Sequence, residues 1–289
     1  MKFAFFGTPD IAVIVLDELE KNGFIPSLVV TNPDAPFGRK HTLTPPPAKA
    51  WAEARGVAVF QPVSLSQNDG HPMTAIFDTK AEWDLFIVAA YGKLMPAWLL
   101  NLPKHGTINV HPSLLPALRG ASPIRSAILG DVRETGATIM QMDAELDHGP
   151  ILAQVPANIS ESKWPLRGRE LDRHLASLGG QLLVETIPRW LNGEVTPIEQ
   201  NHDQATFCTK ITKDMSELTL DPHQLPAGDE AYQMLLKIRA FDGWPETFFI
   251  HEGKRIKIKD AELADNETLR ITRIIPEGKS EMGFDSYFK

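Results

Sequence analysis

Short apolar runs alternate with helix-like stretches through residues 1–200 of this 289-residue chain. Such alternation is typical of strand-helix-strand units, which build a mostly parallel sheet with helices on both faces. The runs are continuously apolar, as in strands that are covered on both sides. We therefore predict an α/β fold. Its expected strands are residues 3–6, 27–30, 57–60, 85–90 and 106–110.

The later part of the chain has a different pattern. Apolar residues recur at helical spacing between Pro165 and Pro188, so we expect a long amphipathic helix that closes a first domain, residues 1–190. The polar residues 191–206 are predicted to be a linker. In residues 207–289 a helix-like segment precedes a β-hairpin pattern, which predicts a second, smaller and mainly β domain.

Composition narrows the class of protein. The chain has 29 Lys and Arg against 37 Asp and Glu, a net charge of −8, which argues against a large basic surface that binds nucleic acid unspecifically. The single cysteine, Cys208, cannot form an intrachain disulfide, which fits a reducing compartment. The longest apolar run, residues 85–91, is far shorter than the roughly 18 residues of a membrane span. We expect a cytoplasmic protein with no membrane contact.

Common nucleotide and metal motifs are missing. The first expected strand ends in Phe6-Gly7-Thr8-Pro9 and not in a Gly-x-Gly-x-x-Gly turn, and no P-loop sequence occurs. The nine histidines show no His-Glu-x-x-His spacing, and one cysteine disfavours a zinc site. We therefore predict no metal site and no bound dinucleotide.

The densest group of reactive side chains follows the fifth expected strand, at Asn109-Val110-His111. Residues two apart on a strand point the same way, so an amide and an imidazole lie together at the carboxyl edge of the sheet. An amide N–H can stabilise the oxyanion of an acyl transfer, and an imidazole can move the proton of the nucleophile. The alternative is a structural one, in which Asn109 caps the strand and His111 is a half-buried loop residue.

An acidic loop offers a partner for this histidine. Residues 143–150 lie between two apolar runs and contain Asp143 and Asp147. A carboxylate from this loop could orient His111 or accept a proton from an amine. Spacing alone does not choose between the two acids.

These segments together resemble the folate-dependent formyltransferases. The resemblance lies in residues 109–124, which include Ser-Leu-Leu-Pro, in residues 134–143, and in Leu-Asp-His-Gly at 146–149. It implies a catalytic trio of Asn109, His111 and Asp147, and so prefers Asp147 to Asp143. It also implies 10-formyltetrahydrofolate as cosubstrate, with no tightly bound cofactor and no metal. The implied cosubstrate site contains Val88, Tyr91, Ser113, Leu114, Leu115 and Pro116.

Further segments are similar to the members of this family that act on tRNA. They are residues 30–39, 43–49 and 59–65, and the similarity continues to the end of the chain. It implies a Rossmann-like domain, a C-terminal OB-like barrel that contacts tRNA, and formylation of the α-amine of methionyl-initiator tRNA. In such enzymes the first of these loops reaches the acceptor end, which implies tRNA contacts for Arg39 and Lys40. We expect a monomer.

Other interpretations remain open. Lys257 and Lys259 alternate to one side of a strand, as either a tRNA phosphate-binding face or a solvated edge that resists aggregation. Arg119 is expected to order the cosubstrate loop or to cap the next helix, and not to be catalytic. Glu145 stands where the family usually has glycine, which changes the conformations open to the loop. The alternative functions are formylation of an amino-sugar nucleotide and non-catalytic binding of folate or RNA.

Overall fold

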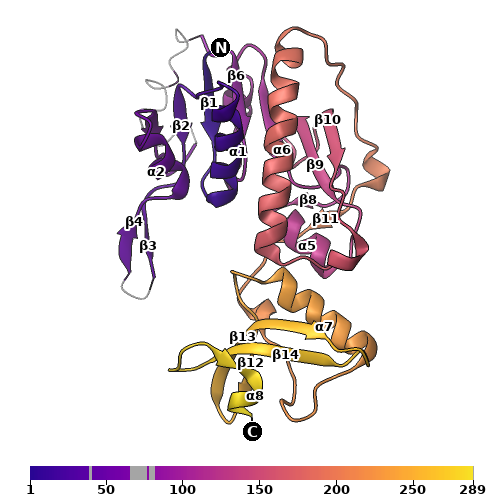
Figure 1. Ribbon diagram of the computed structural model, residues 1–289. Coiled ribbons are helices and arrows are strands. Elements are labelled where there is room, and N and C mark those ends of the chain that lie inside the picture. Colours follow the sequence, from indigo (N-terminus) through magenta and orange to yellow (C-terminus); the bar gives the residue numbers. More distant parts are fainter. Residues whose placement is uncertain (39–40, 66–76, 78–81, 289) are drawn as a thin grey trace. The chain divides into compact units, whose positions relative to one another are not determined.

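A seven-stranded sheet forms the first part of the fold. This computed structural model, drawn in Figure 1, describes residues 1–38, 41–65, 77 and 82–288. The strand order is β10-β9-β7-β6-β1-β2-β5. The pairs among β7, β6, β1, β2 and β5 are parallel, and β9 pairs antiparallel with both β7 and β10. This confirms the predicted mostly parallel sheet. The strands are β1 (Phe3–Phe6), β2 (Leu28–Val30), β5 (Ala58–Phe60), β6 (Leu85–Val88), β7 (Thr107–His111), β9 (Gly136–Gln141) and β10 (Ile151–Pro156).

The sheet is buried on both faces, which explains the continuous apolar runs. Phe3 and Phe5 pack in one core with α1 (Asp10–Lys21) and α6 (Gly168–Leu191). Ala4 and Phe6, which alternate with them, pack in a second core with Phe86 and Tyr91. Neither face of β1 is left to solvent. Shorter helices complete this part, at α2 (Pro47–Glu53) and α4 (Ala97–Leu100).

The long helix α6 begins and ends later than the sequence pattern predicted. Its end at Leu191 lies beyond Pro188, which sits in the last turn. Proline there removes one backbone donor. Trp190 and Leu191 are partly buried against the first core, and the Trp190 indole donates to the His105 carbonyl at 3.0 Å. This packing favours continuing the helix past the proline.

The C-terminal part is a four-stranded antiparallel sheet in the order β12-β13-β14-β15. The predicted hairpin is formed by β12 and β13, and its turn residues Glu252 and Gly253 both have positive φ, as the favoured two-residue hairpin turn requires. The resemblance implied an OB-like barrel in this part of the chain, and the structure has this four-stranded antiparallel sheet there. The elements are α7 (Gly228–Ala240), β12 (Phe248–His251), β13 (Lys254–Leu263), β14 (Leu269–Pro276), β15 (Met282–Gly283) and α8 (Phe284–Tyr287).

The chain forms two compact units. One contains residues 1–121, 134–157 and 173–207, and the other contains residues 122–133, 158–172 and 208–289. The domain boundaries expected from the sequence stay a prediction. The remaining elements are β3 (Ala35–Phe37), β4 (Thr42–Thr44), β8 (Arg119–Gly120), α5 (Pro123–Leu129), β11 (Phe207–Cys208) and the 3₁₀ turns Glu161–Lys163, His202–Gln204 and Asp214–Ser216.

Two kinds of feature are absent from the described part of the chain. None of its helices has the length and apolar character needed to cross a bilayer. None of its groups of His, Cys, Asp or Glu side chains is arranged to hold a metal ion.

Candidate active site

Strand β7 presents Asn109 and His111 on the same face of the large sheet. Ile108 and Val110, which alternate with them, pack in the core with α1 and α6. The exposed fraction is 9% for Asn109 and 3% for His111. An amide and an imidazole therefore lie on one side of the sheet at the carboxyl end of β7, as the period of two along a strand predicted.

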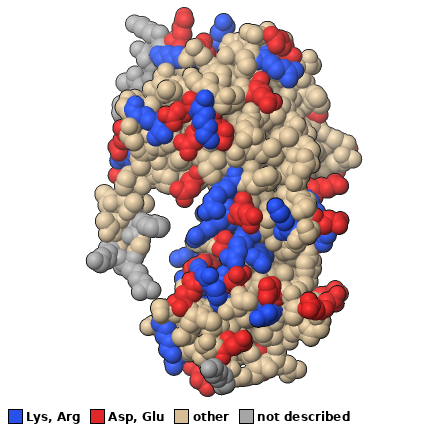
Figure 2. Space-filling view, in the orientation of Figure 1, with Lys and Arg blue, Asp and Glu red and all other residues tan. Residues whose placement is uncertain are grey.

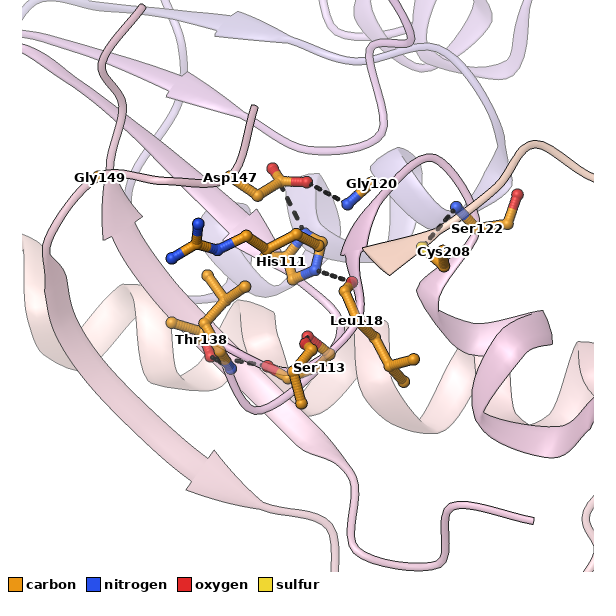
Figure 3. Close-up of polar contacts among 12 residues, drawn as sticks. His111, Ser113, Leu118, Gly120, Ser122, Thr138, Asp147, Gly149 and Cys208 are labelled. Atoms are coloured by element: carbon orange, nitrogen blue, oxygen red, sulfur yellow. Dashed lines mark hydrogen bonds and ion pairs between the residues drawn. The ribbon is translucent and has the colours of Figure 1, made fainter. Parts of the chain in front are cut away.

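Both ring nitrogens of His111 face protein groups (Figure 3). Nε2 lies 3.0 Å from the carbonyl oxygen of Leu118, and Nδ1 lies 3.6 Å from Oδ1 of Asp147. Because a carbonyl oxygen only accepts hydrogen bonds, the proton of the neutral imidazole is assigned to Nε2. The lone pair of Nδ1 then faces the Asp147 carboxylate, so a proton delivered to Nδ1 is stabilised by the negative charge.

The Asp147 carboxylate is held from a second direction. Its Oδ2 accepts a hydrogen bond of 2.7 Å from the backbone N–H of Gly120. The backbone of Asp147 has φ of 51°, in the left-handed region that glycine favours. Glu145, the position where the sequence departs from the family pattern, is not among the positive-φ residues. The unusual backbone of this loop therefore lies at the acid itself.

The other acid of the loop, Asp143, has a different partner. Its Oδ2 lies 2.6 Å from Nδ1 of His148, and its Oδ1 accepts from the N–H of Glu145 at 3.0 Å. Spacing had left the choice between Asp143 and Asp147 open. Of the two acids, Asp147 is the one that the structure places beside His111.

Burial lowers the pKa of His111 below its ordinary value of 6.5. The charge of Asp147 and the Leu118 carbonyl act in the opposite direction, but burial has the larger effect. The imidazole is therefore neutral at pH 7. A neutral imidazole beside a carboxylate can accept a proton from an attacking amine.

The loop after β7 is fixed by side chains from β9 and β10. The Thr138 hydroxyl donates to the Ser113 carbonyl at 2.6 Å and accepts from the Leu115 N–H at 3.2 Å. The Gln154 amide donates to the Leu115 carbonyl at 2.7 Å. Sequence reasoning missed Thr138 and Gln154. The available signal was a polar residue in the interior of each of two mainly apolar strands.

The remaining residues expected at the cosubstrate site differ in burial and in hydrogen bonding. Leu114 and Pro116 are half-buried in the loop after β7, and Val88 pairs in register with Asn109. Tyr91 is 2% exposed, and its hydroxyl has no hydrogen-bond partner among the described residues. Burial raises the pKa of this phenol, so it stays neutral and can donate. A buried hydroxyl without a partner is available to a bound molecule.

The chain is similar to known proteins along most of its length. The model of the formyl transferase family matches residues 1–187, and that of the formyl transferase C-terminal domain matches residues 225–282. The chain belongs to the formyl transferase family. The methionyl-tRNA formyltransferase of Halalkalibacterium halodurans is 37% identical over 306 residues, which cover 98% of this chain and 92% of that protein. That of a Geobacillus species is 36% identical over 313 residues, covering 100% and 94%.

A solved formyl transferase has the same fold. The N-formyltransferase from Helicobacter canadensis, in complex with folinic acid and dTDP-3-aminofucose, superposes with a TM-score of 0.63 at 19% identity. The match covers 92% of this chain and 88% of that one. At this identity the likeness shows the fold alone.

Two of the four residues expected at the tRNA surface of this formyl transferase lie in the described part of the chain. Arg39 and Lys40 lie outside the described residues. Lys257 and Lys259 point away from the core that contains Ile256 and Ile258. The Lys257 ammonium donates to Glu246 at 2.6 Å, and Lys259 donates to the other oxygen of the same carboxylate. Figure 2 shows Lys and Arg side chains interspersed with acidic ones on the face in view.

The lowered pKa of His111 predicts how the stability of this formyl transferase depends on pH. The unfolded chain binds a proton at this residue more readily than the folded chain does, so stability falls as the pH drops below 6.5. We expect the difference in unfolding free energy between wild type and His111→Asn to move against wild type from about pH 8 to about pH 5. Urea unfolding of both proteins measures this difference.

The comparison isolates His111 because the other histidines are present in both proteins. A difference that stays constant over this range, or that moves in favour of wild type at low pH, contradicts the assigned neutral state.

Proposed function

We propose that this protein transfers the formyl group of 10-formyltetrahydrofolate to the α-amine of methionyl-initiator tRNA. The observation that carries the proposal is the position of Nδ1 of His111, 3.6 Å from the Asp147 carboxylate on the sheet face that also holds Asn109. Similarity over 98% and 100% of the chain to two proteins named methionyl-tRNA formyltransferase supports the choice of acceptor. The protein is expected to act in the cytoplasm as a monomer.

The side chains of this site fit the chemistry of the transfer. The α-amine attacks the formyl carbon and forms the new C–N bond, while the Asn109 amide donates to the oxygen that becomes negative. The amine loses its proton to Nδ1 of His111, and the Asp147 carboxylate stabilises the resulting imidazolium. The same proton passes to N10 of the folate as the bond from N10 to the formyl carbon breaks. The products are formyl-methionyl-tRNA and tetrahydrofolate.

An assay with three acceptor conditions tests the function. Transfer of a labelled formyl group from 10-formyltetrahydrofolate is measured with methionyl-initiator tRNA, with amino-sugar nucleotides and without an acceptor. We expect label on methionyl-tRNA alone. Transfer to an amino sugar with none to tRNA selects the sugar enzyme, and binding of folate or RNA without any transfer selects a non-catalytic protein.

We also propose that Arg39, Lys40, Lys257 and Lys259 contact the tRNA. Glu246 accepts a hydrogen bond from each C-terminal lysine and offsets one of their two positive charges, so its substitution has a clear expected effect. Burial raises the pKa of Glu246, but hydrogen bonds from Lys257 and Lys259 outweigh it and the pKa is lowered, so the carboxylate is charged. We expect Glu246→Gln to tighten tRNA binding and to steepen its salt dependence by about 0.7–0.9 per additional phosphate contact.

Binding of tRNA at several salt concentrations measures this slope. The control is the triple variant Glu246→Gln, Lys257→Ala, Lys259→Ala, in which the gain should disappear. An unchanged affinity and slope in Glu246→Gln means that the two lysines form a solvated edge and not a tRNA surface.

A further inference from the structure

The turn that carries Asp147 needs support from outside the loop. With φ of 51°, Asp147 adopts a backbone conformation that residues with a Cβ rarely occupy. Such conformations persist where surrounding contacts hold them, and they gather at functional sites. The N–H of Gly120 holds the carboxylate of Asp147. The backbone of the turn is held by a different residue.

That residue is Gln200, from a segment that the sequence pattern assigned to a linker. Its amide nitrogen donates to two carbonyl oxygens of the loop, at 2.9 Å to Asp147 and 2.7 Å to Gly149. The two bonds bracket the turn on either side of His148. Gln200 is 4% exposed, and its bond to Gly149 is buried while that to Asp147 is part-buried, so both bonds are largely shielded from water, a setting in which an unpaired carbonyl is unfavourable.

Arg119 in turn orients Gln200. Its Nε and Nη2 donate to the side-chain oxygen of Gln200 at 3.1 and 2.7 Å. Because this oxygen accepts from two guanidinium nitrogens, the amide nitrogen must point toward the loop. Arg119 is adjacent to Gly120, whose N–H binds the Asp147 carboxylate, so one short segment contacts both ends of this arrangement.

The same arginine reaches the loop by a second route. Nη2 lies 2.8 Å from Nδ1 of His202, and the His202 ring stacks on His148 with the centroids 4.1 Å apart and the planes 1° from parallel. Arg119 is 3% exposed and makes no ion pair with a carboxylate among the described residues. A buried cation bonded to neutral groups is unfavourable for stability, and such departures are typical of functional sites.

We propose that Gln200 and Arg119 are positioning residues for formyl transfer, which hold the left-handed turn at Asp147 so that its carboxylate stays against Nδ1 of His111. This inference rests on the proposed function and on the roles given there to His111 and Asp147. Gln200 acts through the backbone of the loop, and Arg119 acts through Gln200 and His202.

The kinetics of Gln200 variants test the proposal. We expect Gln200→Ala to lower kcat by about 10- to 100-fold, because a shift of about 1 Å in a reacting group has an effect of this size. The KM values for both substrates should change little, since Gln200 is 4% exposed and its amide is bonded to Arg119 and the loop. Gln200→Glu keeps the oxygen that Arg119 binds but replaces the donor, so it should lose as much activity as Gln200→Ala. Wild-type activity in Gln200→Glu overturns the proposed bonding.

A double-mutant cycle distinguishes positioning from general stabilisation. In the Asp147→Asn background, where the carboxylate is absent, Gln200→Ala should add little to the loss of kcat. A double variant whose loss of kcat equals the product of the two single-variant losses overturns the proposal. The matched control is Thr186→Val, which removes a part-buried bond of 2.6 Å to the Leu182 carbonyl on α6 and should leave kcat unchanged.

The activity of the wild-type protein, assayed alongside, distinguishes a failure of the proposed function from a failure of the positioning role. If wild type transfers no formyl group to methionyl-tRNA, the proposed function fails and this inference fails with it. If wild type is active and folded Gln200→Ala is equally active, the positioning role of Gln200 is wrong and the proposed function stands. Arg119→Lys keeps the charge but cannot offer two donors in one plane, so an intermediate loss of kcat is expected.

Discussion

Asp147→Asn is expected to lower kcat for formyl transfer by about 10²- to 10⁴-fold, the usual contribution of a positioned acid or base. The amide keeps an oxygen that can accept from the Gly120 N–H, so the loop can retain its contact at 2.7 Å. It carries no negative charge, so the imidazolium that forms when His111 takes a proton loses its stabilising partner. Initial rates with both substrates saturating measure the effect.

The matched control is Glu145→Gln, which makes the same change from acid to amide two residues earlier. The Glu145 side chain is 74% exposed, and we expect its kcat within about twofold of wild type because surface charges have small effects. Unfolding curves for both variants exclude a global loss of structure. A rate for Asp147→Asn near that of wild type contradicts the role given to the Asp147–His111 pair.

Gly149→Ala is expected to lower kcat by about 100-fold although residue 149 has no reactive group. A Cβ at this position would lie 2.0 Å from the carbonyl oxygen of Gln141, far inside van der Waals contact. Gln141 ends β9, which is paired with β7 and β10, so the loop must move instead of the strand. The displacement carries Asp147 away from His111, and the overpacking destabilises the fold by about 1–3 kcal/mol.

Gly23→Ala is the matched control for this substitution. Gly23 has φ of 80° and nothing within 4 Å of an added Cβ, so it reports backbone strain alone, about 1–2 kcal/mol. We expect lower stability and unchanged kcat for Gly23→Ala, against a loss of both for Gly149→Ala. A fully active Gly149→Ala enzyme would show that the loop can adapt without moving Asp147.

The sheet and the Asn109–His111 pair were predictable because they depend on local periodicity. Continuous apolar runs identified β1 and β6, since burial on both faces leaves no polar alternation. The period of two placed Asn109 and His111 on one face. These inferences need no knowledge of distant residues.

The partners of that pair were not predictable in the same way. The choice between Asp143 and Asp147 depends on a left-handed turn at Asp147 and on bonds from Gly120 and Gln200, which are far away along the chain. Gln200 lies in a polar stretch that has the composition of a linker. Long-range contacts of single polar residues leave no periodic signal, so sequence reasoning placed this residue in a connection and not near the acid.

The segment Leu118–Gly120 contacts both members of the His111–Asp147 pair. The Leu118 carbonyl selects which ring nitrogen of His111 is protonated, while the Gly120 N–H holds the carboxylate that faces the other nitrogen. The tautomer of His111 and the position of the Asp147 carboxylate therefore depend on the same backbone segment. A substitution that shifts this segment will alter the pH optimum and kcat together. A variant of this segment that is engineered to work at acidic pH should therefore have a lower kcat than wild type.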